Sequence, residues 1–208
     1  MLGRMTFTDT QPAMTMTNEY DLYLPGNPYT ASELSAMAYQ GMLRPQFGPY
    51  YVDVDQPDTA SQRAKSVRMV AEQIIKGSWT ATLLTAAWIH LGGQPPEMLE
   101  AATATSHRGT SRSKTMSTAL RHCDYLELEN VGEEDLRVIG GVVVTSPELT
   151  IDDLLKIGGH ERHQHIARRL CALVEADTLC QRFAAVDPEL NATRQLLTNV
   201  EPAAVHAG

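Results

Sequence analysis

The chain has 208 residues, of which 43% are hydrophobic and 20% charged, and its formal net charge is -8 at pH 7. This composition is typical of a globular chain that buries its own core, and the acidic balance excludes a general nucleic-acid scavenger. Cys123, Cys171 and Cys180 are odd in number and form no CxxC pair, which excludes a disulfide framework and a zinc ribbon. No run approaches the roughly 18 apolar residues of a membrane span, so we expect a cytoplasmic protein without a membrane partner.

Charge is unevenly distributed along the chain. Residues 1–60 hold two basic and seven acidic side chains, residues 61–125 hold eight and four, and residues 126–208 hold seven and fourteen. The middle third is therefore locally basic, at 8 minus 4, or +4. Any contact with phosphate is expected to draw on this pool. Its members are Arg63, Lys65, Arg68, Lys76, Arg108, Arg112, Lys114 and Arg121.

The N-terminal quarter predicts one short helix followed by a strand. Residues 1–28 are expected to form a disordered arm. Thr30 and Glu33 make a capping box, and Gly41 is a natural end for the helix that follows. The turn at residues 47–49 precedes a β-favouring run at residues 50–54. The pattern fits the closing half of a winged helix or a helix-hairpin cap on the main domain, and pattern alone does not decide between them.

Two helices and two strands are expected next. The first helix begins at a capping box of Thr59 and Gln62, ends before Gly77, and keeps its basic residues off the apolar stripe. The second, "TATLLTAAWIHL", begins near Ser78 or Thr80 and ends at Gly92. The strands are "EMLEAATA" and "DYLELEN", and between them lies the polar loop "TSHRGTSRSKT".

A hairpin and a helical C-terminus complete the prediction. The strand-like segments at residues 136–139 and 142–145 flank two glycines, whose tolerance of positive φ is typical of a two-residue hairpin turn. Two overlapping helix starts follow, at residues 145–148 and 150–153, and the segment 160–200 is helical by pattern. The expected fold class is α/β (α+β), with a small winged-helix-like element at 29–57, a mixed domain of antiparallel strands and helices at 58–200, and a tail at 201–208.

Motifs for catalysis are missing from the chain. No phosphate-binding glycine loop, kinase motif set or nucleophile elbow occurs in it. His160, His163 and His165 could supply a metal pair, but solvated histidines at a helix start are the preferred interpretation. Asp152 and Asp153 could hold magnesium, although acidic residues near a helix start are also favoured by the helix dipole. We therefore predict no catalytic residue, no metal and no cofactor.

The polar loop at residues 105–115 is the clearest candidate for a binding function. Arg108, Arg112 and Lys114 alternate in it with hydroxyl-bearing residues, a composition common in segments that follow a phosphate backbone. Ordinary solvation of a long loop is the alternative, and the sequence leaves both open.

Four segments in chain order resemble the AbiEi antitoxins of abortive-infection toxin-antitoxin systems. They are "YTASELSAMAYQGMLRPQFGPYYV", "TLLTAAWIHLGG", "EMLEA" and "LRVIGGVVVTSPELTIDDLL", and they span about residues 29–155. The most specific pieces are the Thr-Ala-Ala-Trp motif at 85–88 and Val-Thr-Ser-Pro at 144–147, followed by Thr150, Asp153 and Leu154.

The resemblance implies an antitoxin that binds its operator DNA as an autorepressor and counteracts a nucleotidyltransferase-like toxin, with which it need not form a stable complex. Arg44 with Gln46 would then approach the DNA groove. The residues Arg63, Lys65, Arg68, Lys76, Arg108, Arg112 and Lys114 would contact phosphates. Two alternatives stay open: an atypical serine/threonine protein kinase that phosphorylates the toxin with ATP and magnesium, and an antitoxin that covers the toxin sterically.

Overall fold

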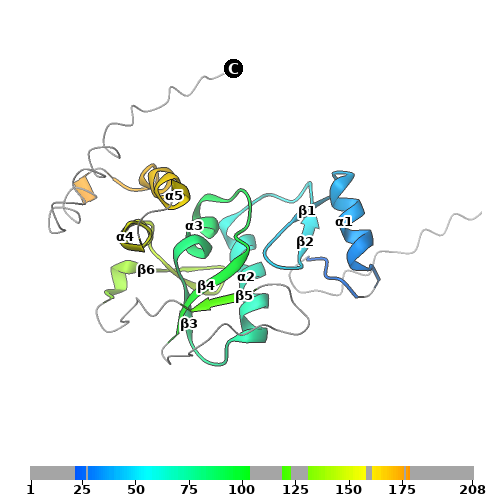
Figure 1. Ribbon diagram of the computed structural model, residues 1–208, viewed down its shortest axis with the longest axis horizontal. Coiled ribbons are helices and arrows are strands. Elements are labelled where there is room, and N and C mark those ends of the chain that lie inside the picture. Colours follow the sequence, from blue (N-terminus) through cyan, green and yellow to red (C-terminus); the bar gives the residue numbers. More distant parts are fainter. Residues whose placement is uncertain are drawn as a thin grey trace, which may run out of the picture.

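The computed structural model describes residues 22–26, 28–103, 119–122, 131–157, 161–175 and 177–178, and these form a mixed α/β fold (Figure 1). The α/β fold class expected from the sequence is thus confirmed. None of the helices in these ranges combines the length and the apolar composition needed to cross a membrane. In chain order the elements are α1 (Ala31–Tyr39), β1 (Leu43–Pro45), β2 (Tyr51–Asp53), α2 (Ala60–Ile74), β3 (Trp79–Ala81), α3 (Leu83–Leu91), β4 (Met98–Thr103), β5 (Ala119–His122), the 3-10 helix η2 (Glu133–Asp135), β6 (Leu136–Ile139), β7 (Val142–Thr145), α4 (Pro147–Ile157) and α5 (Glu161–Cys171).

The main sheet has five strands in the order β5-β4-β3-β7-β6. β3 pairs with β4 antiparallel and β6 with β7 antiparallel, whereas β3 with β7 and β4 with β5 pair parallel. The sheet is therefore mixed, where the sequence had suggested antiparallel strands. The strand expected at 124–130 and the helices expected beyond residue 178 lie outside the described residues, as do residues 1–21.

The N-terminal element is a helix and a β-hairpin packed on the main domain. Thr30 and Glu33 form the predicted capping box at the start of α1. The hairpin of β1 and β2 places Phe47, Tyr50 and Val52 in the same hydrophobic cluster as α2 and the five-stranded sheet. Phe47 also faces the Trp88 ring, with the ring centroids 6.0 Å apart. Through these hairpin residues the element shares the core of the main domain.

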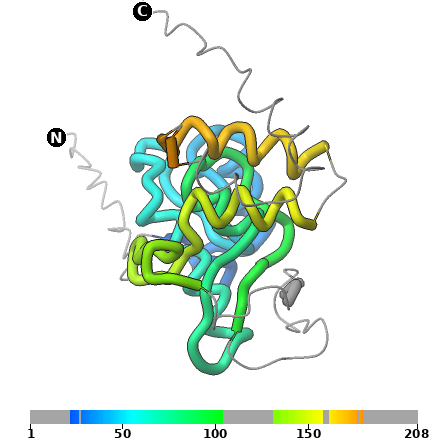
Figure 2. Tube along the Cα trace, turned by 90° about the vertical axis from the view of Figure 1, so that its left-hand side faces the viewer, coloured from blue at the N-terminus to red at the C-terminus, as the bar shows by residue number. Residues whose placement is uncertain are grey.

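Two apolar clusters meet at α3. The larger one joins α2, through Ala64, Val67 and Val70, to the sheet residues and to the hairpin. The smaller one joins α3 to α4 and α5 through buried aliphatic side chains. Its buried members are Leu83, Ala87, Ile151, Leu154, Ala167 and Leu170. Figure 2 shows α4 and α5 lying side by side, and in Figure 1 this pair is at the opposite end of the molecule from α1, β1 and β2.

The start of α3 differs from its prediction. Residues 79–81 are strand β3, at the centre of the sheet between β4 and β7, and the helix begins only at Leu83. Thr82 makes no side-chain cap; instead the backbone N–H of Leu84 donates to the buried Glu100 carboxylate, N···O 2.8 Å. A carboxylate at a helix N-terminus satisfies free N–H groups and complements the helix dipole. A residue from β4 therefore decides where α3 begins.

The hairpin predicted around Gly140 and Gly141 is confirmed. Both glycines have positive φ, 57° and 79°, which fits a two-residue turn with positive φ at both central positions. A Cβ at Gly140 would approach the Ser61 backbone oxygen of α2 to 2.5 Å, so close packing also requires glycine there.

Helix α4 begins at the first of its two predicted starts. It runs from Pro147, and the Leu149 N–H donates to Ser146 Oγ, 3.2 Å. The Thr150 hydroxyl lies inside the helix and donates to the Ser146 carbonyl oxygen at 2.7 Å. Thr150 is thus part of the cap junction and not a second start.

Arg63, a buried side chain of α2, ties that helix to the C-terminal end of α3. Arg63 is 5% exposed, and its guanidinium donates to the Ile89 carbonyl through Nε (3.1 Å) and Nη2 (2.9 Å) and to the Asp58 carboxylate at 2.8 Å. A further, longer hydrogen bond reaches the His90 carbonyl at 3.4 Å. These carbonyls belong to the last turn of α3, where helical partners run out. We call this set of contacts the Arg63 clamp.

We expect Arg63→Ala to lower the free energy of unfolding by about 3 kcal/mol, because it leaves buried carbonyl oxygens without donors. Arg68→Ala, on the same helix, is the matched control. Arg68 pairs with Glu72 at 2.6 Å and is 39% exposed, so its loss should cost less than about 1 kcal/mol. Urea denaturation followed by circular dichroism measures both. Equal destabilisation by the two substitutions would contradict the structural role assigned to Arg63.

Candidate nucleic-acid interface

The two side chains predicted to approach a DNA groove, those of Arg44 and Gln46, are both at least partly buried. Arg44 is half-buried, and its Nη2 donates to the Gln56 carbonyl at 3.1 Å. Gln46 is only 3% exposed. A buried amide cannot contact a base edge without a rearrangement, so the structure argues against Gln46 as a groove contact.

The four basic residues predicted on α2 and just after it have different surroundings. Arg63 is buried in the clamp, where its N–H groups donate to α3, so its surroundings give no support to the prediction that it contacts phosphate. Arg68 and Lys65 are half-buried, and Arg68 shares its charge with Glu72. Lys76 is exposed beyond the end of α2. The structure therefore does not gather the predicted α2 cations into one free basic surface.

Other predicted sites are separated or lie outside the described residues. Arg108, Arg112 and Lys114 of the basic loop lie outside them, so their contact with phosphate stays a prediction, and His160 lies outside them too. His163 is 7% exposed whereas His165 is exposed, so these two histidines face different surroundings. Among the described residues no group of three or more metal-ligating side chains occurs.

The aspartates considered for magnesium are buried. Asp152 and Asp153 are 7% and 9% exposed and lie in the middle of α4, while Glu148 is the acidic residue of its first turn. The helix-dipole explanation for the two aspartates is therefore wrong, because α4 begins earlier than position 150. Their burial also gives the kinase alternative no open nucleotide contact at these residues.

Helix α5 presents surface cations to which the sequence analysis assigned no phosphate contact. Arg162, Arg168 and Arg169 are exposed, and His165 is exposed between them. Within the described part of the chain none of the three arginines forms an ion pair. The segment Glu161–Cys171 carries three arginines and one glutamate, 3 minus 1 or +2, in a chain of net charge -8. The signal was present in the sequence: Arg162, His165 and Arg169 recur at helical spacing beside the apolar positions that face α3 and α4.

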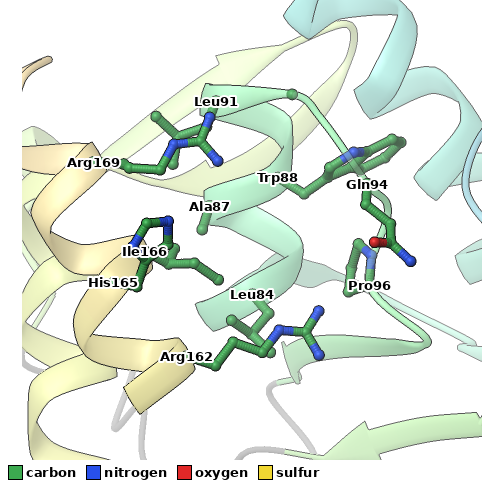
Figure 3. A pocket seen from close by; sticks show the side chains of 11 residues that line it. Leu84, Ala87, Trp88, Leu91, Gln94, Pro96, Arg162, His165, Ile166 and Arg169 are labelled. Carbon is green, nitrogen blue, oxygen red and sulfur yellow. The ribbon is translucent and has the colours of Figure 1, made fainter. Parts of the chain in front are cut away.

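The arginines of α5 border a pocket between α5, α3 and the loop after α3 (Figure 3). Its volume is about 210 Å³. Leu84, Ala87, Trp88 and Leu91 of α3 line one side and Arg162, His165, Ile166 and Arg169 of α5 line the other; Gly92, Gln94 and Pro96 complete it. Arg162 and His165 also border a second hollow, on the other side of the helix, together with Glu161, Gln164 and Arg168. The α5 cations therefore lie both at the pocket and along the adjoining surface.

The loop wall of this pocket is held by hydrogen bonds from the core. Trp88 Nε1 donates to the Gly93 carbonyl at 2.9 Å. Gly92 has φ 71°, and a Cβ there would approach Arg63 Nη1 to 2.9 Å. The Arg63 clamp and Trp88 thus fix the course of the chain as it leaves α3.

His90, in the last turn of α3, links the pocket-lining helix to the Val144–Pro147 motif. Its ring Nε2 lies 2.8 Å from the Thr145 carbonyl oxygen, to which a protonated Nε2 donates. Burial lowers the pKa of His90, and the positive charges of Arg137 and Arg63 act in the same direction. The Thr145 carbonyl and the Glu148 carboxylate raise the pKa but do not outweigh burial.

The lowered pKa of His90 predicts a pH-dependent stability. Between the native pKa and the ordinary value of 6.5, the unfolded chain binds more protons at this residue than the folded one. The contribution of His90 to the free energy of unfolding should therefore be full above pH 6.5 and fall as the pH decreases through the native pKa.

Urea denaturation of the wild type and of His90→Gln, at intervals from about pH 7.5 down to about pH 5, tests this. Glutamine keeps an N–H donor but does not titrate. The His90→Gln variant should therefore lose less stability on acidification than the wild type. If the free energies of unfolding of the two proteins change with pH in parallel, the pH dependence does not come from His90.

Comparison with protein-family models, with curated protein sequences and with solved structures finds no match to this chain.

Proposed function

We propose that this protein is an AbiEi-type antitoxin that acts in the cytoplasm, binds the DNA of its own operon as an autorepressor and counteracts a nucleotidyltransferase-like toxin. The observation that carries the DNA-binding part is the exposed cationic face of α5, formed by Arg162, Arg168 and Arg169, with the exposed His165 between them. Arginines on one helix face that form no ion pair with a described acidic residue are suited to phosphate oxygens, which accept hydrogen bonds from their N–H groups.

The spatial contact between two sequence motifs supports the antitoxin part. The Thr85–Trp88 helix and the Val144–Pro147 motif are about sixty residues apart in the sequence, yet the hydrogen bond between His90 and Thr145 joins them. Thr145 Oγ1 in turn lies 2.7 Å from Thr150 Oγ1. The motifs that resemble the antitoxin family therefore build one structural unit, next to the α5 cations.

Alanine substitution of Arg162, Arg168 and Arg169 together should weaken binding to duplex DNA from the region upstream of the gene. Each lost phosphate contact reduces the slope of log K against log salt by about 0.9, so up to about 2.7 for three contacts. Fluorescence anisotropy between about 50 and 200 mM salt measures affinity and slope. Arg137→Ala, an exposed arginine on β6, is the control and should bind like the wild type. An unchanged slope in the triple variant would remove α5 from DNA binding.

A second triple variant, with alanine at Arg108, Arg112 and Lys114, measures in the same assay how much the basic loop contributes to DNA binding independently of α5. If both surfaces contact one duplex, the slopes lost by the two variants should add, since they remove different phosphate contacts. A loss confined to the loop variant would move the interface from α5 to the loop.

The proposal that this chain counteracts a toxin is tested by expressing both genes in cells. Growth should stop when a nucleotidyltransferase gene adjacent to this one is expressed alone and recover when this chain is expressed from a separate promoter. With both genes under foreign promoters, recovery cannot come from repression. Continued growth arrest would contradict direct counteraction and leave autorepression alone.

A further inference from the structure

We propose that the pocket between α3, the loop Gly92–Pro96 and α5 binds a single nucleotide, with its base inside and its phosphate on the α5 arginines. This inference deepens the proposed function, because it uses the same cationic face. The inference goes beyond the proposed function because it assigns a binding site for a base, whereas the proposed function needs only phosphate contacts.

The pocket offers the two kinds of surface that a nucleobase requires. Leu84 and Ile166 line the pocket and are partly exposed, so they provide apolar area for a planar ring, while Ala87 and Pro96 are buried in its walls. Gln94 on the same loop is exposed, and its side-chain amide carries both a donor and an acceptor for a base edge. Figure 3 shows Gln94 beside Pro96 and the Arg162 side chain extending from α5 toward that side of the pocket. Guanidinium planes are frequent stacking partners for unpaired bases.

The volume of the pocket, about 210 Å³, is below the range of about 300–1,000 Å³ common for larger ligands. The pocket is therefore suited to a small ligand of about one ring system. A base inside an intact duplex is covered by its neighbours, so it could enter only when unpaired.

The arrangement of cations fits a phosphate on the rim of the pocket. Arg162 and Arg169 are seven residues apart on α5, which places them about 10 Å apart along its axis, one toward each end of the pocket. Arg168 continues the positive surface to the outer hollow, which His165 and the acidic Glu161 also line. A nucleotide seated in the pocket would thus have cations near its own phosphate and near the next phosphate of a strand.

A base with an adjoining phosphate can be supplied either by a free mononucleotide or by an unpaired nucleotide in a nucleic acid. Three DNA probes of equal length distinguish them: a fully paired duplex, the duplex with one unpaired base, and the duplex with an abasic site at the unpaired position. Adenosine, cytidine, guanosine and thymidine 5′-monophosphates form the fourth arm. Anisotropy and competition at fixed salt give all affinities.

We expect the duplex with an unpaired base to bind roughly tenfold more tightly than the paired duplex, and the abasic probe to lose this advantage. Gln94→Ala and Ile166→Trp should abolish the advantage, the first by removing the base-edge contact and the second by filling the pocket. Both should leave affinity for the paired duplex unchanged. Gln40→Ala, at an exposed glutamine beyond α1, is the control. Competition by a mononucleotide that is sensitive to Gln94→Ala would indicate a free nucleotide as the ligand.

The results separate failure of the pocket from failure of the proposed function. Binding of paired duplex that depends on the α5 arginines, without gain from the unpaired base and without mononucleotide competition, would overturn the nucleotide pocket alone. No binding of any probe by the folded protein would overturn both. A gain that persists in Gln94→Ala and Ile166→Trp would place base recognition elsewhere and overturn the pocket.

Discussion

Helix α3 depends on partners from other elements at both of its ends. At its C-terminal end the Arg63 clamp supplies N–H donors to the carbonyls of Ile89 and His90. At its N-terminal end the Glu100 carboxylate of β4 accepts from the Leu84 N–H. A positive group at the C-terminus and a negative one at the N-terminus both complement the helix dipole. Because both apolar clusters include residues of α3, these two contacts also hold the clusters together.

This dependence explains which parts of the fold the sequence could predict. The caps at Thr30 and Thr59 and the glycine hairpin at residues 140–141 rest on residues within a few positions of each other, and all three were placed correctly. The start of α3 was missed because Glu100, sixteen positions after Leu84, provides its cap. Strand β3 was missed because three residues are too few for an alternating pattern to show.

The candidate site was less predictable than the fold for a related reason. The sequence does not show whether a charged side chain will lie on the surface or will bind the end of a helix in the interior. The sequence led to the same prediction for Arg63 and Arg68 of α2. In the structure Arg63 is buried in the clamp, whereas Arg68 is partly exposed beside Glu72. The pocket could not be predicted either, since its walls come from α3 and α5, which are separated in the sequence by β4, β5, η2, β6, β7 and α4.

Burial also changes the meaning of the charge counts. Residues 126–208 have twice as many acidic as basic side chains, which pointed away from phosphate binding. In the folded chain Asp135, Asp152 and Asp153 of this segment are all less than 10% exposed, whereas the arginines of α5 are on the surface. The acidic residues that lower the net charge are thus partly withdrawn from the surface that would meet a polyanion. An electrostatic interface can therefore arise within an acidic segment, because a ligand responds to the local field of exposed charges and not to their sum along the chain.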